Sequence, residues 1–249
     1  MKSRFVSTIS NRAMNNGPII TIEEKFLANF WELLLNFLFP LQCAICGRSL
    51  TADNRDRVCK DCWGRIIYLN RPIDIRLSLE RIWSVGVYDG VLKDLIHQFK
   101  YKQKKYLANP LGKLLVDFVR KYLKEERFDY IVPIPLEKAR EKKRGYNQAE
   151  LLARVLGEAV NKPVLTHLVE RRKKTKPQFG LKREERFENL SGAFEISEPG
   201  KKNVPPIAGK TILLLDDLAT TGATLDECAK ALKRAGVSEV NGLVLAHGM

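Results

Sequence analysis

Four apolar runs along the chain predict the strands of a sheet. The clearest is the unbroken aliphatic run from Ile212 to Leu215, which is typical of a strand that is buried on both faces of a parallel sheet. The other three are Ile82 to Tyr88, Asp129 to Ile134 and Val240 to Ala246. We expect these runs to form one α/β core, with the strand of the first run ending at Asp216 and Asp217.

Amphipathic stretches lie between and after these runs and predict helices. They cover Val91 to Phe99, Leu107 to Leu123, Asn147 to Val160 and Leu225 to Gly236. A further helix is expected to begin at Thr21 and to end near Pro40, whereas Met1 to Ile20 show no periodicity and are expected to form a mobile tail. The apolar side of the helix from Thr21 could lie on a membrane surface, but its polar side is poor in basic residues, which favours docking on the protein's own core.

The composition indicates a globular protein that attracts polyanions. The chain has 249 residues, 45% of them hydrophobic, which allows one α/β domain and a small appendage. Its formal charge of +14 favours diphosphorylated substrates, nucleic acid or an acidic protein as ligands, without choosing among them. No signal-peptide pattern is present, and the apolar run from Trp31 to Pro40 is too short to span a bilayer. We therefore expect a cytoplasmic protein without stable membrane insertion.

Four of the five cysteines form two CxxC pairs that predict a structural zinc site. Cys43 and Cys46 are separated by twelve residues from Cys59 and Cys62. Two such pairs can present four thiolates to one tetrahedral Zn²⁺ ion. A redox-active CxxC is the alternative, but one pair would suffice for that. The fifth cysteine, Cys228, falls on the apolar side of its helix and is expected in the core.

The segment from Thr211 to Leu225 (TILLLDDLATTGATL) carries the most specific chemistry. Its predicted strand is followed by a hydroxyl-rich turn made of Thr220, Thr221, Gly222, Ala223 and Thr224, which leads into a helix. Backbone N–H groups and the positive end of the helix dipole suit a phosphate monoester there. The carboxylates of Asp216 and Asp217 can accept hydrogen bonds from two adjacent hydroxyls and can stabilise a sugar that becomes cationic. A ribose 5-phosphate would match both features.

Other interpretations of this segment match its spacing less well. Gly209, Lys210 and Thr211 resemble the end of a Walker A loop, but Val204 stands where its first glycine belongs. Leu218 stands where the second acid of an aspartyl-phosphate phosphatase would be needed. A buried strand followed by an ordinary capped helix remains the plain structural alternative.

The segment KYKQKKY, residues 100–106, has two interpretations. Its lysines, Lys100, Lys102, Lys104 and Lys105, interleave with Tyr101 and Tyr106 and could bind a nucleic-acid backbone while the rings stack on bases. A solvated helix end is the alternative that the pattern favours.

The segment from Ile212 to Thr224 resembles the phosphoribosyl diphosphate (PRPP) motif of type I phosphoribosyltransferases. Three further features resemble the ComF family, phosphoribosyltransferase-like proteins associated with bacterial competence: IVPIPL, RGYNQAELLA, and the spacing of Thr175, Gln178, Arg186, Asn189 and Phe194. With the zinc finger, the resemblance covers the chain from about Leu33 onward. It implies a twisted parallel sheet flanked by helices over residues 76–249, a helix and zinc finger over 21–75, and a tail over 1–20.

The resemblance also implies roles for individual residues. PRPP would bind with Mg²⁺, its 5-phosphate on Thr220 to Thr224 and its ribose on Asp216 and Asp217, which would also be the catalytic residues. A basic loop after the strand that ends at Ile134 would bind the diphosphate through Pro135, Leu136, Lys138 and Arg144. The basic segment from Arg171 to Arg186 falls where the family has a mobile lid, and a solvated loop is the alternative.

The acceptor and the activity remain open at this stage. No residue is an obvious general base, and no base-recognising hood follows the core, which makes the zinc module a candidate for that role. A non-catalytic module is the alternative on the same fold. It would bind single-stranded DNA or a competence partner such as a helicase.

Overall fold

The computed structural model describes residues 41–51, 53–54, 56–69, 71–73, 77–123, 127–172, 182–197 and 205–248. The chain divides into two compact units, Met1–Leu41 and Gln42–Met249, and all elements below belong to the second. The expected tail, the helix from Thr21, and most of the expected lid lie outside the described residues. Among the residues that are described, no helix is both long enough and apolar enough to cross a bilayer.

A five-stranded sheet in the order β1-β2-β7-β6-β3 forms the centre of the unit. Its four parallel strands are β2 (Arg81–Val87), β3 (Tyr130–Pro133), β6 (Thr211–Ala219) and β7 (Glu239–His247), and β1 (Pro72–Ile73) pairs antiparallel at one edge. All four expected strands are therefore present. A separate antiparallel pair joins β4 (Val169–Arg171) to β5 (Phe194–Ile196).

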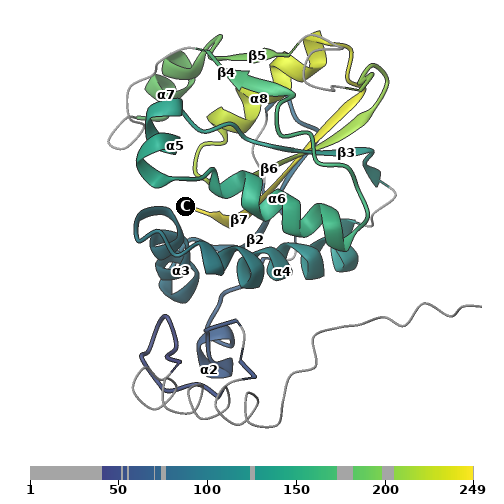
Figure 1. Ribbon diagram of the computed structural model, residues 1–249. Coiled ribbons are helices and arrows are strands. Elements are labelled where there is room, and N and C mark those ends of the chain that lie inside the picture. Colours follow the sequence, from purple (N-terminus) through teal and green to yellow (C-terminus); the bar gives the residue numbers. More distant parts are fainter. Residues whose placement is uncertain are drawn as a thin grey trace, which may run out of the picture. The chain divides into compact units, whose positions relative to one another are not determined.

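Helices cover both faces of this sheet (Figure 1). The larger ones are α3 (Gly90–Tyr101), α4 (Ala108–Phe118), α6 (Gln148–Ala159) and α8 (Ala223–Arg234). A 3-10 turn (Lys105–Leu107) precedes α4, and a π-helical turn (Val119–Leu123) follows it. Three shorter helices are α2 (Lys60–Trp63), α5 (Lys138–Arg144) and α7 (Arg183–Leu190).

Strand β6 shows why its apolar run is continuous. Leu213 and Leu215 pack into one core cluster with α3, α4 and α6, while Ile212 and Leu214 pack into a second cluster with α8. All four side chains are fully buried. Burial of one such side chain contributes about 2 kcal/mol to the free energy of unfolding. The strand is therefore stabilised by apolar contacts on both of its faces.

Two elements differ from the sequence-based expectation. The expectation that the strand ends at Asp216 and Asp217 is wrong, because β6 continues to Ala219. Its partner β7 is equally long and extends the ladder, pairing Asp216 with Val244 and Ala219 with His247. The basic segment after β3 was expected to be a loop, but residues Lys138–Arg144 form helix α5, which ends at Gly145 with a left-handed φ of 82°.

Short-range contacts fix how α6 meets the rest of the core. The Asn147 side chain accepts a hydrogen bond from the N–H of Ala149 at 3.0 Å and donates one to the carbonyl of Ile134 at 2.9 Å. It thus caps α6 and joins the helix to the end of β3. Gly112 of α4 has no space for a side chain, because a Cβ there would lie 2.5 Å from Val155 of α6.

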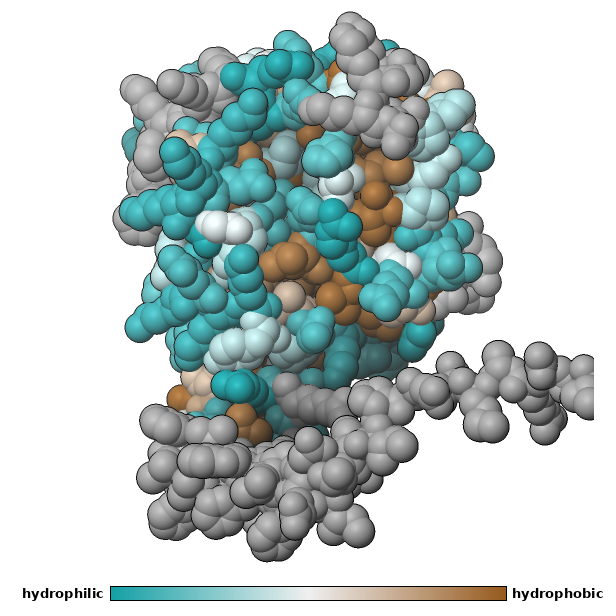
Figure 2. Space-filling view, viewed as in Figure 1, coloured by the Kyte–Doolittle hydropathy of each residue, from teal (hydrophilic) through white to brown (hydrophobic). Residues whose placement is uncertain are grey.

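Figure 2 shows hydrophilic residues over most of one face, with apolar residues gathered near its middle.

Candidate functional site

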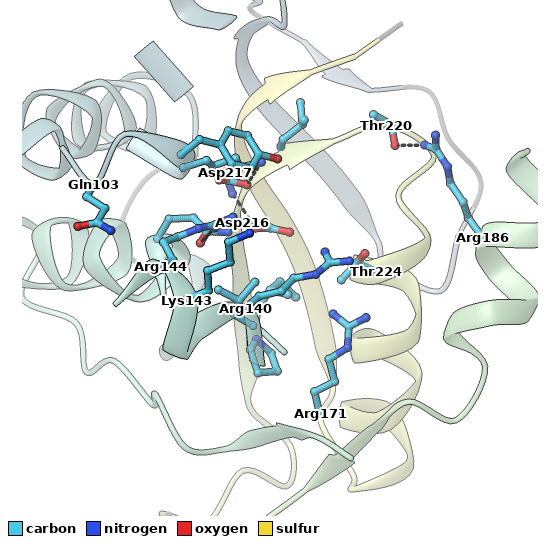
Figure 3. A pocket seen from close by; sticks show the side chains of 17 residues that line it. Gln103, Arg140, Lys143, Arg144, Arg171, Arg186, Asp216, Asp217, Thr220 and Thr224 are labelled. Carbon is cyan, nitrogen blue, oxygen red and sulfur yellow. Dashed lines mark hydrogen bonds and ion pairs between the residues drawn. The ribbon is translucent and has the colours of Figure 1, made fainter. Parts of the chain in front are cut away.

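A pocket of about 620 Å³ lies where the carboxyl ends of β3 and β6 meet (Figure 3). The register places the end of β3 beside the residue that precedes the acidic pair of β6, because Pro133 pairs with Leu215 and the N–H of Ile134 donates to the Leu215 carbonyl at 2.9 Å. The acidic lining residues are Asp216 and Asp217, and the basic ones are Lys100, Arg140, Lys143, Arg144, Arg171 and Arg186. Thr220, Thr224, Pro135 and Leu136 also line it. A pocket of this character suits an anionic ligand that also carries hydroxyl groups.

The two aspartates occupy different environments within this pocket. Asp216 is partly exposed, and its Oδ1 accepts a hydrogen bond from the N–H of Asp217 at 2.8 Å. Asp217 is only 2% exposed, and its Oδ1 lies 2.9 Å from the ammonium nitrogen of Lys100. Among the described residues, the Oδ2 atom of Asp217 is buried without a hydrogen-bond partner. The pair therefore offers one carboxylate that faces the pocket and one buried acceptor atom.

The ionisation of Asp216 is strongly disfavoured. Burial and, next, the like charge of Asp217 raise the pKa of Asp216 to about 8, although the nearby charge of Lys100 acts in the opposite direction. A cationic ligand close to Asp216 would favour its ionised form.

Replacing Asp216 by asparagine should stabilise the ligand-free protein at alkaline pH. Folding raises the pKa of Asp216 above its value in the unfolded chain. The contribution of this carboxyl group to stability is therefore fully present below about pH 4 and is lost as the pH rises through the folded-state pKa. Asp216→Asn has no such loss, so its free energy of unfolding should exceed that of the wild type by about 1 kcal/mol or more at pH 8.5. Urea unfolding at pH 5 and 8.5 measures this difference. A difference that is the same at both pH values would contradict the assignment.

The threonine-rich turn leads directly into the N-terminus of α8. Gly222 is the N-cap of α8 with a left-handed φ of 76°, and a Cβ there would lie 2.6 Å from Leu77. The left-handed conformation favours glycine here, and any larger residue would also displace the Leu77 side chain. Thr220 and Thr224 line the pocket, and the Thr221 hydroxyl accepts a hydrogen bond from the N–H of Ala223 at 3.4 Å. The helix begins at Ala223, two residues earlier than expected.

The helical conformation of α5 determines which basic residues of the segment after β3 line the pocket. Arg140, Lys143 and Arg144 stand three and four residues apart, on one side of the helix, and line the pocket. Lys138, which was expected to bind the diphosphate, is exposed and is not among the lining residues. Arg140 and Lys143 belonged to the basic segment but were not singled out. Helical periodicity would have identified them if the segment had been interpreted as a helix.

The expected lid contributes at both of its described ends. Arg171 of β4 and Arg186 of α7 both line the pocket, and the Arg186 guanidinium donates to the Thr220 hydroxyl at 2.6 Å. Residues 173–181 lie outside the described residues.

Lys100 is a further lining residue whose buried partner the sequence did not identify. The interpretation of segment 100–106 as a solvated helix end is wrong for this residue, because its side chain is 13% exposed and paired with Asp217. The nucleic-acid interpretation does not fit this side chain either. No local sequence pattern predicts the pairing of Lys100 with Asp217, because the two residues lie on separate elements, α3 and β6.

The four cysteines of the two CxxC pairs come together as expected. Their sulfur atoms all lie within 4.8 Å of one another, and the pairs Cys43–Cys62 and Cys46–Cys59 are 3.7 Å apart. Four thiolates around a tetrahedral Zn²⁺ ion would lie about 3.8 Å apart, since each Zn–S bond is about 2.3 Å. The donor set and its dimensions fit a structural zinc ion. Cys228 is fully buried in the core, as expected.

Backbone groups contribute to the charge state of these cysteines. Burial disfavours the Cys43 thiolate, but the N–H groups of Cys46, Cys59 and Ile45 outweigh it and lower the pKa of Cys43 to about 6. Burial raises the pKa of Cys62 to about 12, despite a hydrogen bond from Arg65 at 3.0 Å. A bound metal ion would hold all four in the thiolate form.

Comparisons with known proteins agree with this architecture. Residues 111–249 match the model of the phosphoribosyl transferase domain, and residues 34–77 match that of the double zinc ribbon domain. The chain is 33% identical to competence protein F of Haemophilus influenzae over 196 residues, which cover 76% of this chain and 84% of the relative. It is 31% identical to competence protein ComFC of Bacillus subtilis, over 78% of this chain and 72% of the relative. It is 29% identical to the DNA utilization protein YhgH of Escherichia coli, over 80% and 86%.

These matches confirm the expected fold class, a type I phosphoribosyltransferase-like sheet flanked by helices with a four-cysteine zinc ribbon before it. The protein belongs to the competence protein F family.

Proposed function

We propose that this protein binds PRPP together with Mg²⁺ and transfers its phosphoribosyl group to an acceptor. The observation that carries the proposal is the meeting of three groups in one pocket: the acidic pair of β6, the turn at the start of α8, and the cations of α5. They complement the ribose hydroxyls, the 5-phosphate and the diphosphate of PRPP, respectively.

The residues present also fit a magnesium ion. Mg²⁺ usually takes one or two protein carboxylates and completes its shell with substrate phosphates and water. Asp216, which faces the pocket, would hold it on the protein side, with Asp217 adjacent. When bound, the ion would neutralise charge on the diphosphate.

In the proposed reaction the bond between the anomeric carbon and the diphosphate breaks as a bond to the acceptor forms. Arg140, Lys143 and Arg144 would stabilise the departing charge, and the aspartates would stabilise the cationic sugar. No histidine is among the lining residues that the structure describes, so the acceptor would supply its own nucleophile, as a nucleobase or an amine can.

Calorimetric titration of PRPP into the zinc-loaded protein tests this function. We expect saturable binding in the presence of MgCl₂, weaker binding without it, and weaker binding of ribose 5-phosphate. A screen of bases and amines for pyrophosphate release would then identify the acceptor. The absence of binding at millimolar PRPP would refute the proposal.

A second candidate function is binding of single-stranded DNA by segment 100–106. Tyr101 and Tyr106 are 65% and 40% exposed, with Arg144 5.6 Å from the first ring and Arg57 5.0 Å from the second. Exposed rings among cations are what a sequence-tolerant single-strand binder requires. The relatives' names, which refer to competence and DNA utilization, are consistent with this candidate.

Reversing the charge of two exposed lysines of this segment tests the DNA candidate. For Lys102→Glu combined with Lys105→Glu we expect weaker binding of an oligothymidine and a salt dependence shallower by about 1.4, since each phosphate contact contributes about 0.7. Fluorescence anisotropy at several salt concentrations measures this slope. An unchanged slope would exclude the segment as the binding surface.

A further inference from the structure

We propose that Lys100 is a positioning residue of this pocket. Its ammonium group pairs with Asp217 and so keeps a metal ion away from that carboxylate. It would reserve Asp217 for a ribose hydroxyl and leave the metal ion to Asp216. This inference rests on the proposed function, because it assigns the parts of PRPP and its metal ion to particular atoms.

The pair between Lys100 and Asp217 is buried and close. The ammonium nitrogen lies 2.9 Å from Oδ1, and the two side chains are 13% and 2% exposed. A buried carboxylate is stable only when a counter-charge or several hydrogen bonds compensate for its lost hydration. Lys100 provides this compensation, so the charge of the acidic pair is already partly neutralised before any ligand binds.

Neighbouring elements hold the end of α3 that carries Lys100. The preceding residue, Phe99, is fully buried, and its carbonyl accepts a hydrogen bond from the Tyr146 hydroxyl. One residue earlier, the Gln98 side chain donates to the carbonyl of Ala44 in the zinc ribbon at 2.8 Å. The backbone next to Lys100 is therefore fixed from two sides, which places its ammonium group beside Asp217 before a ligand arrives.

This arrangement distinguishes the two carboxylates. A metal ion that approached Asp217 would meet the positive charge of Lys100 within a few ångströms, and this repulsion is strong in a poorly hydrated site. A neutral hydroxyl meets no such repulsion and can donate to Oδ2 of Asp217, which is buried without a partner among the described residues. Lys100 also acts electrostatically on Asp216, but its ion pair is with Asp217, and no ion pair of Asp216 is found among the described residues. A cation at the partly exposed Asp216 therefore approaches Lys100 less closely than a cation at Asp217 would.

A titration of the zinc-loaded protein with Mn²⁺ in the absence of PRPP, monitored by electron paramagnetic resonance, tests whether Lys100 keeps a metal ion away from Asp217. In the wild type we expect weak binding. Lys100→Met removes the resident cation and leaves two adjacent carboxylates, so Mn²⁺ should bind about tenfold more tightly or better. Lys100→Gln should show the same gain, and it can still donate a hydrogen bond to Asp217 if the methionine variant folds poorly. A purely structural role for Lys100 would predict no gain of metal binding.

Three further variants control for the interpretation. Lys100→Arg keeps the charge and should behave as the wild type does. Lys102→Met removes a neighbouring exposed lysine and should leave Mn²⁺ binding unchanged. In Lys100→Met combined with Asp217→Asn the gain should disappear. The proposal is overturned if Lys100→Met and Lys100→Gln both bind Mn²⁺ as weakly as the wild type, or if Lys102→Met shows an equal gain.

PRPP binding by the same variants separates this inference from the proposed function. If the wild type binds PRPP, Lys100→Met should reduce its affinity by about tenfold or more, and Lys100→Arg should restore most of it. If the wild type binds no PRPP, the proposed function fails, while the Mn²⁺ titration still decides whether Lys100 excludes a metal ion from Asp217.

Discussion

Replacing Asp216 and Asp217 together by asparagine is expected to weaken PRPP binding by about a hundredfold or more. Each carboxylate that loses a charge-assisted hydrogen bond to a ligand hydroxyl or its metal ion costs about 1.5–3 kcal/mol. The side chains keep their size, and the amide oxygen at position 217 can still accept a hydrogen bond from Lys100. Calorimetry with PRPP and MgCl₂ on wild type and variant measures the loss.

Two further variants make this result specific. Asp94→Asn combined with Asp117→Asn removes the same charge from exposed positions on α3 and α4 and should leave PRPP binding nearly unchanged. Asp216→Asn alone keeps the pair between Lys100 and Asp217 and should lose part of the affinity without unfolding the protein. If the double variant of the acidic pair binds PRPP as the wild type does, these residues are not the ribose site. DNA uptake that survives the double change in cells would show that a PRPP site is not required for it.

Loss of the zinc site is expected to destabilise the protein by several kcal/mol, since structural zinc contributes its binding energy directly to folding. In Cys59→Ser the ion loses one of four thiolates. The melting temperature should then fall by about 10 °C, and the zinc content should drop below one ion per chain. The effect should extend beyond the ribbon, because Cys43, Val58, Cys59 and Cys62 pack in the same core cluster as α3 and α4.

Cys228→Ala is the matched control for this experiment. It removes a thiol that is fully buried but lies in the other core cluster, on α8. We expect some loss of stability from the smaller side chain and an unchanged zinc content. Metal analysis of the two purified variants, combined with thermal unfolding, distinguishes them. A Cys59→Ser protein that retained one zinc ion per chain and melted as the wild type does would refute the assignment.

The sequence by itself determined the elements whose residues lie close together along the chain. The unbroken apolar run from Ile212 to Leu215 predicts a strand that is buried on both faces. The structure confirms this, because alternate residues of the run pack in two different core clusters. The spacing of the cysteines reports a four-thiolate site, because each CxxC turn brings two sulfur atoms together locally. The acidic pair and the threonine-rich turn were visible for the same reason: one strand, one turn and one helix N-terminus carry them.

The tertiary structure decided what depends on residues far apart in the chain. Strand β6 extends past Asp217 because β7 offers backbone partners to its end. Arg140 and Lys143 line the pocket, and Lys138 does not, because the segment is helical and one side of α5 faces the pocket. The partnership of Lys100 with Asp217 exists only because α3 and β6 pack together. The periodicity of apolar residues predicts which side of a helix or strand is buried. It does not predict which residue pairs with a buried charge, because that depends on how distant elements pack together.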